Sequence, residues 1–348
     1  MKEWAPKIKK WGRDAVSHLK MGVIHLEQKR YEEAVVEFEN ALKLDPSLGM
    51  AYLHIGKAYM KQGKIDAAAE QCHKALEIDP SQPEAHLLLA YIHYQNREYD
   101  KASYHCDMTL EKNPKLDSAY NLLGLVYRDQ GQVIKAIRFF KKSLRLNSNR
   151  VAVWAVLGDL YFQEKKYSDA IKSFQKASEL NPEMPYAHYG LGKVYMEQER
   201  YDEANSEFQQ ASLRNPVQSV GEFSRGIASL RSKRYERAID LFNLVLHKYP
   251  KWAIVYLFLG DAYREQKHFD EAITSYKKAL SLDPSLTMCY YKLGLVYIDL
   301  NQIPDAIDQF KEALCRDPDF VEASIELRNI PEEGKLINDY VSAFHRDN

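Results

Sequence analysis

Histidines are the side chains in this sequence whose spacing comes nearest to a chemical site. His86 and His93 lie seven residues apart, as do His18 and His25, so each pair would share one face of a helix. Two imidazoles on one face can bind Zn²⁺, but a zinc site needs two further ligands at the same height. Neither pair has such ligands, and aromatic residues occupy the equivalent places elsewhere in the chain's repeating pattern. We therefore interpret these histidines as packed side chains.

Two other patterns could do chemistry, a pair of cysteines and two glycine–lysine segments. Cys72 and Cys106 lie 34 residues apart, which places them on packed helices about 8–10 Å from each other, too far for an unstrained disulfide. We expect buried, reduced thiols, which fit a cytoplasmic location. The segments 56–64 and 190–193 lack the preceding strand that a phosphate-binding loop requires. The sequence therefore predicts no catalytic site, no metal site and no cofactor.

Composition excludes several classes of protein. The 348-residue chain carries 48 Lys and Arg against 49 Asp and Glu. Its formal net charge of -1 lacks the basic excess of a nucleic-acid binder. No apolar run reaches the roughly 18 residues of a membrane-spanning helix, and residues 1–14 lack the apolar core of a secretory signal. A hydrophobic content of 45% is too high for a disordered chain.

A 34-residue period organises most of the chain. Counting position 1 at Ala15, nine units follow one another without a gap through Phe320. Position 32 is proline in eight units, at Pro46, Pro80, Pro114, Pro182, Pro216, Pro250, Pro284 and Pro318. Position 8 is glycine in eight units, at Gly22, Gly56, Gly124, Gly158, Gly192, Gly226, Gly260 and Gly294. Position 20 is alanine in all nine, from Ala34 to Ala306. Such a period indicates one supersecondary unit, repeated.

Each unit reads as two amphipathic helices. In the first unit, apolar residues recur at three-and-four spacing over residues 16–28 and again over residues 31–44. Gly22 and Ala34 are small, which predicts that the two helices cross closely there. Pro46 ends the second helix because proline lacks an amide hydrogen and clashes with the preceding turn.

This pattern resembles the tetratricopeptide repeat family over residues 15–320. The resemblance implies an all-α fold, a right-handed superhelical solenoid of helix-turn-helix repeats. Terminal units of a solenoid need caps, so we expect a capping helix over residues 1–14 and capping helices over residues 321–348. Trp4, Ile8 and Trp11 share a face among basic residues, and the alternative for this segment is a peripheral membrane or partner anchor.

The resemblance also implies where a partner binds. In this family the first helix of each repeat lines the concave surface, mainly at positions 2, 5, 9, 12 and 13. Many of these positions are apolar here, as expected for a groove that binds an apolar peptide or an amphipathic helix. The candidate groove residues are Val16, Leu19, Val23, Met50, Leu53, Tyr91, Tyr94, Asn121, Arg128, Tyr186, Tyr189, Val220, Phe223, Ile227, Ile254, Met288, Tyr291 and Leu295.

Two binding solutions known in the family do not match these residues. The carboxylate clamp needs Lys at position 5 of a repeat, where no unit here has Lys. The asparagine ladder of the O-linked N-acetylglucosamine transferases needs Asn at position 6, where no unit has Asn. We therefore expect a non-enzymatic, cytoplasmic scaffold or adaptor for protein partners. The alternatives are a substrate-recruiting arm of an enzyme complex, such as a glycosyltransferase, and a self-assembling structural scaffold.

Overall fold

Paired α-helices form all the regular structure in residues 14–214 and 218–330, the part of the chain that the computed structural model describes. No strand occurs in these residues. In chain order the helices are α2 (Ala15–Glu27), α3 (Tyr31–Leu44), α4 (Gly49–Lys61), α5 (Ile65–Ile78), α6 (Pro83–Gln95), α7 (Tyr99–Lys112), α8 (Asp117–Asp129), α9 (Val133–Leu146), α10 (Val151–Gln163), α11 (Tyr167–Leu180), α12 (Pro185–Glu197), α13 (Tyr201–Arg214), α14 (Gln218–Arg231), α15 (Tyr235–Lys248), α16 (Ala253–Glu265), α17 (Phe269–Leu282), α18 (Thr287–Asp299), α19 (Ile303–Arg316) and α20 (Val321–Asn329). The helices predicted for the first repeat agree with α2 and α3 to within one residue.

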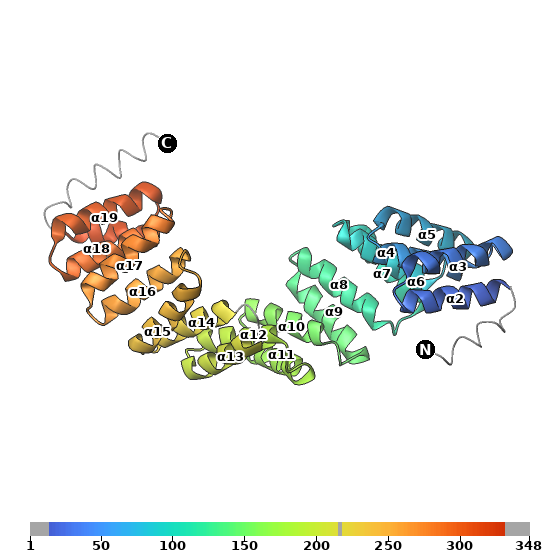
Figure 1. The fold of residues 1–348 in the computed structure, drawn as a ribbon, viewed down its shortest axis with the longest axis horizontal. Helices are drawn as coiled ribbons and strands as arrows, with labels where there is room; N and C mark the ends of the chain where they lie inside the picture. The colour runs from blue at the N-terminus through green and yellow to red at the C-terminus, as the bar shows by residue number, and fades with distance from the viewer. Residues whose placement is uncertain (1–13, 215–217, 331–348) are drawn as a thin grey trace. The chain divides into compact units, whose positions relative to one another are not determined.

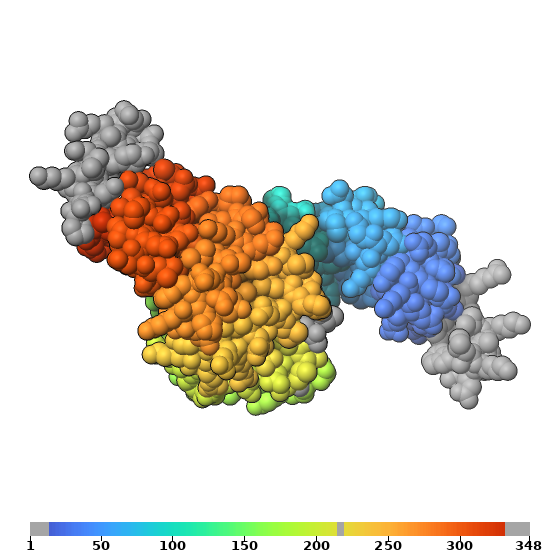
Figure 2. All heavy atoms as spheres, turned by 60° about the vertical axis from the view of Figure 1, so that its left-hand side comes forward, coloured from blue at the N-terminus to red at the C-terminus, as the bar shows by residue number. Residues whose placement is uncertain are grey.

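Contacts divide the chain into two compact units, Met1–Leu160 and Tyr161–Asn348, and each is described by itself. In the N-terminal unit α2 packs on α3, α3 on α4, and so on to α9 (Figure 1). In the C-terminal unit the same order runs from α11 to α20. Successive repeats of that unit, yellow to red, lie against one another as layers in Figure 2. Each unit is therefore an all-α solenoid of helix-turn-helix pairs, as predicted.

The expected terminal caps fall mostly outside the described residues. Residues 1–13 of the predicted N-terminal cap and residues 331–348 of the predicted C-terminal cap are not described. Helix α20 covers the beginning of the predicted C-terminal cap, and its Ala323 and Leu327 pack into one core cluster with Ala306, Phe310 and Ala313 of α19.

A left-handed residue at position 15 makes the turn inside every repeat. Two of the nine are glycines, Gly63 and Gly131, with φ of 75° and 73°. The other seven are Lys29, Arg97, Lys165, Glu199, Lys233, Lys267 and Asn301, with φ between 56° and 63°. A side chain in this conformation brings Cβ too close to the next carbonyl oxygen, at a cost of about 1–2 kcal/mol. Most repeats therefore hold this turn against an unfavourable local conformation.

Short polar side chains close the turn between repeats. In seven of the nine repeats the Asp or Asn side chain at position 31 accepts a hydrogen bond from the backbone N–H two residues later, as Asp45 does from Ser47 at 3.0 Å and Asp283 from Ser285 at 3.0 Å. The Ser47 backbone and hydroxyl bonds hold the pKa of Asp45 below its usual value. This geometry is an Asx turn, and it explains why Asp or Asn precedes the repeated prolines.

The side chain at position 4 of the next repeat also contacts this turn. In three repeats a polar atom of this side chain lies near the backbone carbonyl six residues earlier, at position 32. The contacts are Nε2 of His86 with the Pro80 carbonyl at 3.1 Å, Nε1 of Trp154 with Ser148 at 2.8 Å, and the hydroxyl of Tyr256 with Pro250 at 3.2 Å. Three different side chains thus perform one structural role.

In six repeats the glycine at position 8 faces an aromatic ring at position 24. A Cβ on Gly22 would lie 2.5 Å from the Phe38 ring, and one on Gly226 would lie 2.4 Å from the Phe242 ring. Gly124, Gly192, Gly260 and Gly294 meet Phe140, Phe208, Tyr276 and Phe310 in the same way. The sequence predicted a close crossing, but the partner of Gly22 is the Phe38 ring rather than Ala34. Even a methyl group does not fit.

We expect Gly226→Ala to lower the free energy of unfolding by about 1–3 kcal/mol, because overpacked cores lose about that much. The third repeat has Ala90 and Cys106 at these two positions. Pairing Gly226→Ala with Phe242→Cys should therefore destabilise the protein by less than the sum of the two single changes. Urea titrations of the four proteins measure this coupling, and strictly additive losses would contradict it.

The turn at position 15 makes a second prediction. Nothing lies within 4 Å of a Cβ placed on Gly131, so Gly131→Ala tests the backbone alone and should destabilise the protein by about 1 kcal/mol. Lys267→Gly should stabilise it by about 0.5 kcal/mol, since relief of the left-handed conformation exceeds the added entropy of the unfolded chain. Thermal unfolding followed by circular dichroism measures both, and a loss of stability in Lys267→Gly would contradict the idea.

Candidate functional site

Side chains at repeat positions 2, 5, 9 and 12 of the first helices form what we call the first-helix face. The large apolar side chains that are exposed on this face all stand at position 2. In the N-terminal unit Val16 is 51% exposed and Met50 43%, and in the C-terminal unit Tyr186 is 48%, Val220 40% and Met288 38% exposed. Single exposed apolar residues are ordinary, whereas these residues recur at one repeat position, and we call the set of them the contact row.

Other predicted groove residues are half-buried, and one is not on the surface. The half-buried ones are Leu19, Val23, Tyr91, Tyr94, Asn121, Arg128, Tyr189, Phe223, Ile227, Ile254, Tyr291 and Leu295. The prediction was wrong for Leu53, which is 0% exposed and packs with Ala75 and Ala85 in a core cluster. The two alanines let α5 and α6 approach α4 closely enough to enclose the leucine side chain.

Position 5 supplies scaffold contacts as well as surface. The Phe223 ring lies 5.2 Å from Trp252, 5.5 Å from Phe258 and 6.0 Å from Phe242 between centroids. Aromatic pairs at these separations stabilise a core beyond the area that they bury. A polar substitution of Phe223 would therefore unfold its surroundings, and Val220 and Ile227 are better probes of binding.

Polar side chains join consecutive repeats along the far end of the face. In the N-terminal unit the Tyr94 hydroxyl donates to Asp129 at 2.7 Å, and Nη2 of Arg128 lies 3.4 Å from the same hydroxyl. Burial and Asp129 raise the pKa of Tyr94 to about 12. In the C-terminal unit Arg264 donates to Asp299 at 2.8 Å. Both links run from position 12 of one repeat to position 13 of the next.

Three hollows follow helix α14 of the C-terminal unit from its beginning to its end. The first, about 430 Å³, lies between α12, α13 and α14 and includes Tyr189 and Val220. The second, about 120 Å³, includes Phe162, Lys193 and Ile227, with the Lys193 ammonium 4.8 Å from the centre of the Phe162 ring. The third, about 270 Å³, is charged and includes Arg231, Lys233, Arg264 and Lys292.

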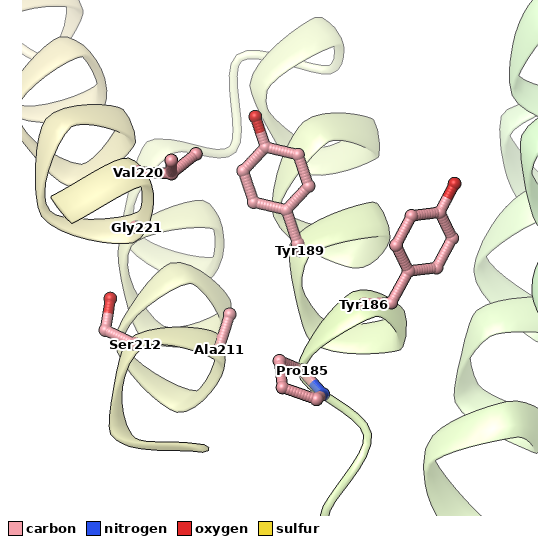
Figure 3. Close-up of a pocket in the computed structure, with 7 residues that line it drawn as sticks. All are labelled: Pro185, Tyr186, Tyr189, Ala211, Ser212, Val220 and Gly221. Atoms are coloured by element: carbon pink, nitrogen blue, oxygen red, sulfur yellow. The ribbon is translucent and has the colours of Figure 1, made fainter. Parts of the chain in front are cut away.

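The first hollow is lined mainly by aromatic and aliphatic side chains. In Figure 3 the Tyr189 ring lies between Val220 of α14 and Tyr186 of α12, and Ala211 and Ser212 of α13 form its wall. The sequence prediction of the groove missed Ser212 and Gly221, because it considered positions 2, 5, 9, 12 and 13 of the repeat and these two residues stand at positions 28 and 3. Their signal in the sequence is a departure from the repeat, since position 28 is leucine in seven of the nine units.

The histidines are packed against other side chains. Nδ1 of His86 lies 2.9 Å from Nδ1 of His105, whose ring stacks on His93 with centroids 5.3 Å apart. His105 is nineteen residues from His86, on α7, and the same spacing brings Nδ1 of His18 to 2.7 Å from Glu37. In residues 14–214 and 218–330 no group of three or more His, Cys, Asp or Glu is arranged to hold a metal ion.

The cysteines are four free thiols, and Cys72, Cys106 and Cys289 are buried. Burial raises the pKa of each of these three thiols to about 12, so they are protonated and poorly reactive near neutral pH. Among the described helices, none is long and apolar enough to cross a membrane.

Comparisons with known proteins agree with this architecture. A family model described as "TPR repeat" matches residues 22–63, 56–96, 158–199 and 260–299, and two tetratricopeptide repeat models match residues 189–253 and 289–320. Residues 95–177 match a model described as anaphase-promoting complex, cyclosome, subunit 3. The chain belongs to the tetratricopeptide repeat family. Proteins of this family are protein-interaction scaffolds and are typically non-catalytic.

Solved structures show the same fold. The C-terminal part of a TPR repeat-containing protein from Cytophaga hutchinsonii is 18% identical, with 69% of this chain and 99% of that chain covered and a TM-score of 0.61. Pseudomonas aeruginosa PilF is 22% identical over 58% of this chain and 92% of its own, with a TM-score of 0.54. Yeast Tom70 is 16% identical over 95% and 91%, with a TM-score of 0.50. No curated protein sequence matches the chain.

We expect the N-terminal unit to lose stability in mild acid, with His54 as one cause. Burial, together with nearby Lys57, lowers the pKa of His54 to about 4, and its Nδ1 is buried without a hydrogen-bond partner. Since the unfolded histidine titrates near 6.5, the stabilising contribution is complete above that pH and is lost as the pH falls from 6.5 to 4. His54→Phe should flatten this part of the stability–pH curve.

Phenylalanine suits this position, because Phe258 occupies position 6 of the eighth repeat and stacks on Phe242, as His54 stacks on Phe38. The measurement is the midpoint of urea unfolding at pH 7 and at pH 5. An equal drop between the two pH values in wild type and His54→Phe would show that His54 does not contribute.

Proposed function

We propose that this chain is a non-enzymatic scaffold that binds a protein partner along its first-helix face. The observation that carries the proposal is the row of exposed apolar side chains at position 2, three of which (Tyr186, Val220 and Met288) lie in the C-terminal unit. Burying such side chains against a partner is favourable by about 25 cal/mol per Å² of apolar area. The partner's contact segment is a peptide or an amphipathic helix with apolar side chains on one side.

The chemistry of the described residues favours binding over catalysis. The buried thiols have raised pKa values, and the ring nitrogens of His86 lie against His105 and a backbone carbonyl. These groups serve packing rather than proton transfer or nucleophilic attack. The cysteines are free thiols, as is usual in the reducing cytoplasm, and we propose the cytoplasm as the location of the protein.

The seventh repeat offers a matched pair of substitutions. Val220 on α14 is 40% exposed and lies on the first-helix face, whereas Leu244 on α15 is 51% exposed and lies on the second helix of the same repeat. We expect Val220→Glu to abolish partner capture and Leu244→Glu to preserve it, because only the first places a charge in the contact surface. Capture from native lysate with cross-linking and mass spectrometry measures both variants.

Circular dichroism of the two variants serves as the folding control. Equal capture by both folded variants would reject the first-helix face as the binding surface. Light scattering at increasing protein concentration tests the alternative of self-assembly, and a concentration-dependent mass that Val220→Glu abolishes would identify a second copy of the chain as the partner. Co-purification of an enzyme that cross-links to this face would identify the chain as a recruiting arm.

A further inference from the structure

Two small residues face each other at the junction of the sixth and seventh repeats. Position 28 is leucine in seven repeats but Ser212 here, and position 3 is Gly221 here, the one glycine among the nine repeats. A Cβ on Gly221 would lie 2.0 Å from Oγ of Ser212 and 3.0 Å from the Phe208 carbonyl oxygen. The missing leucine and the missing methyl group let α14 approach α13 at this point and leave the first hollow open beside it.

The first hollow suits an apolar side chain. Its volume is about 430 Å³, and its walls are aromatic rings and aliphatic groups (Figure 3). The Ser212 hydroxyl donates to the Phe208 carbonyl at 2.8 Å, so this hydroxyl proton is already used within α13. A leucine, methionine or phenylalanine side chain entering the hollow would cover Tyr189 and Val220.

The third hollow, at the other end of α14, has unbalanced positive charge. Lys292 pairs with Asp261 at 3.3 Å, and Asp261 also accepts from the Tyr276 hydroxyl at 2.7 Å. Arg264 pairs with Asp299, and Glu265 accepts from the Tyr235 hydroxyl at 3.2 Å. Asp261 and Asp299 are therefore neutralised by ion pairs, whereas Glu265 keeps its negative charge, so Arg231 and Lys233 leave the hollow with a net positive charge.

Arg231 and Lys233 line the same hollow, are both exposed, and form no ion pair with another described residue. A carboxylate from a partner would supply the missing negative charge, and the arginine could hold it through two parallel hydrogen bonds.

From these features we infer that α14 is the floor of a site for an extended acidic–apolar peptide segment of about five residues. Val220 and Arg231 are eleven positions apart on the helix, which is about 16 Å at 1.5 Å per residue. An extended chain covers that distance in about five residues. The segment places one large apolar side chain in the first hollow and one carboxylate beside Arg231 and Lys233. This inference rests on the proposed binding to the first-helix face and adds the partner's chemistry and spacing.

Synthetic peptides test the inference directly. The probe is a fluorescein-labelled Gly/Ser peptide with one Phe and one Asp five residues apart, and binding to the full chain is followed by fluorescence anisotropy. Replacing Phe by Ser, replacing Asp by Asn, or shortening the spacing to two residues should each weaken binding at least about tenfold. Raising the salt concentration should weaken binding of the Asp peptide more than that of the equally labelled Asn peptide, because salt screens the additional charge contact.

The carboxylate has two possible sources, an acidic side chain or the end of a chain. A second pair of peptides carries Phe five residues before the C-terminus, with a free carboxylate in one and an amide in the other. Tighter binding of the free acid than of the Asp peptide assigns the site to a C-terminal tail. Tighter binding of the Asp peptide assigns it to an internal acidic segment.

Substitutions in the protein provide the matched test. The double variant Ser212→Leu/Gly221→Ala restores the residue types common in other repeats and should fold, while closing the first hollow and weakening the Phe–Asp peptide about tenfold or more. The variant Arg231→Glu/Lys233→Glu should prefer a Phe–Lys peptide over the Phe–Asp peptide. Lys251→Glu, an exposed charge reversal in the turn before α16, is the control and should bind like wild type.

Equal binding of all peptides, or an unchanged preference in Arg231→Glu/Lys233→Glu, would overturn the inference. The proposed function fails separately. If lysate capture depends on Val220 but the peptides do not bind, the first-helix face binds a partner of other chemistry. If capture is independent of Val220 and the peptides still bind best with Phe and Asp five residues apart, α14 binds a peptide but the exposed residues at position 2 of the other repeats do not bind the partner.

Discussion

The contact between a glycine and an aromatic ring determines how the two helices of most repeats meet. A ring at position 24, such as Phe38 or Phe310, packs against the first helix at the point where Gly22 or Gly294 has no side chain. These rings are almost fully enclosed, so one interaction sets both the helix separation and the largest buried apolar surface of the repeat. The outer positions of the first helix then point away from the core. The first-helix face follows from this packing.

Repeats that lack the ring keep the same helix arrangement through complementary sizes. The second repeat combines Gly56 with Cys72, and a Cβ on that glycine would lie 3.2 Å from the sulfur. The third combines Ala90 with Cys106, and both are fully buried. The total volume of the two side chains differs between repeats, and what is kept is how closely their shapes pack, as expected for interiors packed at crystal-like density. These thiols are therefore structural, which agrees with their raised pKa values.

The period of 34 residues was sufficient to predict the helices and the register of the fold, because proline, glycine and alanine mark each repeat at fixed positions. It could not predict the left-handed turn at Lys233 or Lys267, since lysine carries no turn signal and the surrounding helix pair imposes the conformation. Leu53 was misplaced because position 5 is on the surface in some repeats and in the core in others. His105 was missed because its partner His86 lies on the other helix of the pair, a spacing that helical periodicity within one segment does not reveal.

The charges of the C-terminal unit show a related limit. Arg264 and Asp261 stand at positions 12 and 9 of the repeat, but only the structure shows that both form ion pairs with neighbours and that Arg231 and Lys233 do not. Formal net charge, at -1 for the chain, averages over such local differences. Recognition by charge can therefore be local in a protein whose overall field is weak.

The pair of small residues at Ser212 and Gly221 has a consequence for how this architecture tolerates binding sites. Oγ of Ser219, two residues before Gly221, is buried without a hydrogen-bond partner, which costs stability at this junction. In a globular core such a defect would weaken the whole domain. In a linear array each repeat touches only its neighbours, and the loss stays at one junction. A solenoid can therefore acquire a new binding site through looser packing between two repeats, while the packing of the other repeats is unchanged.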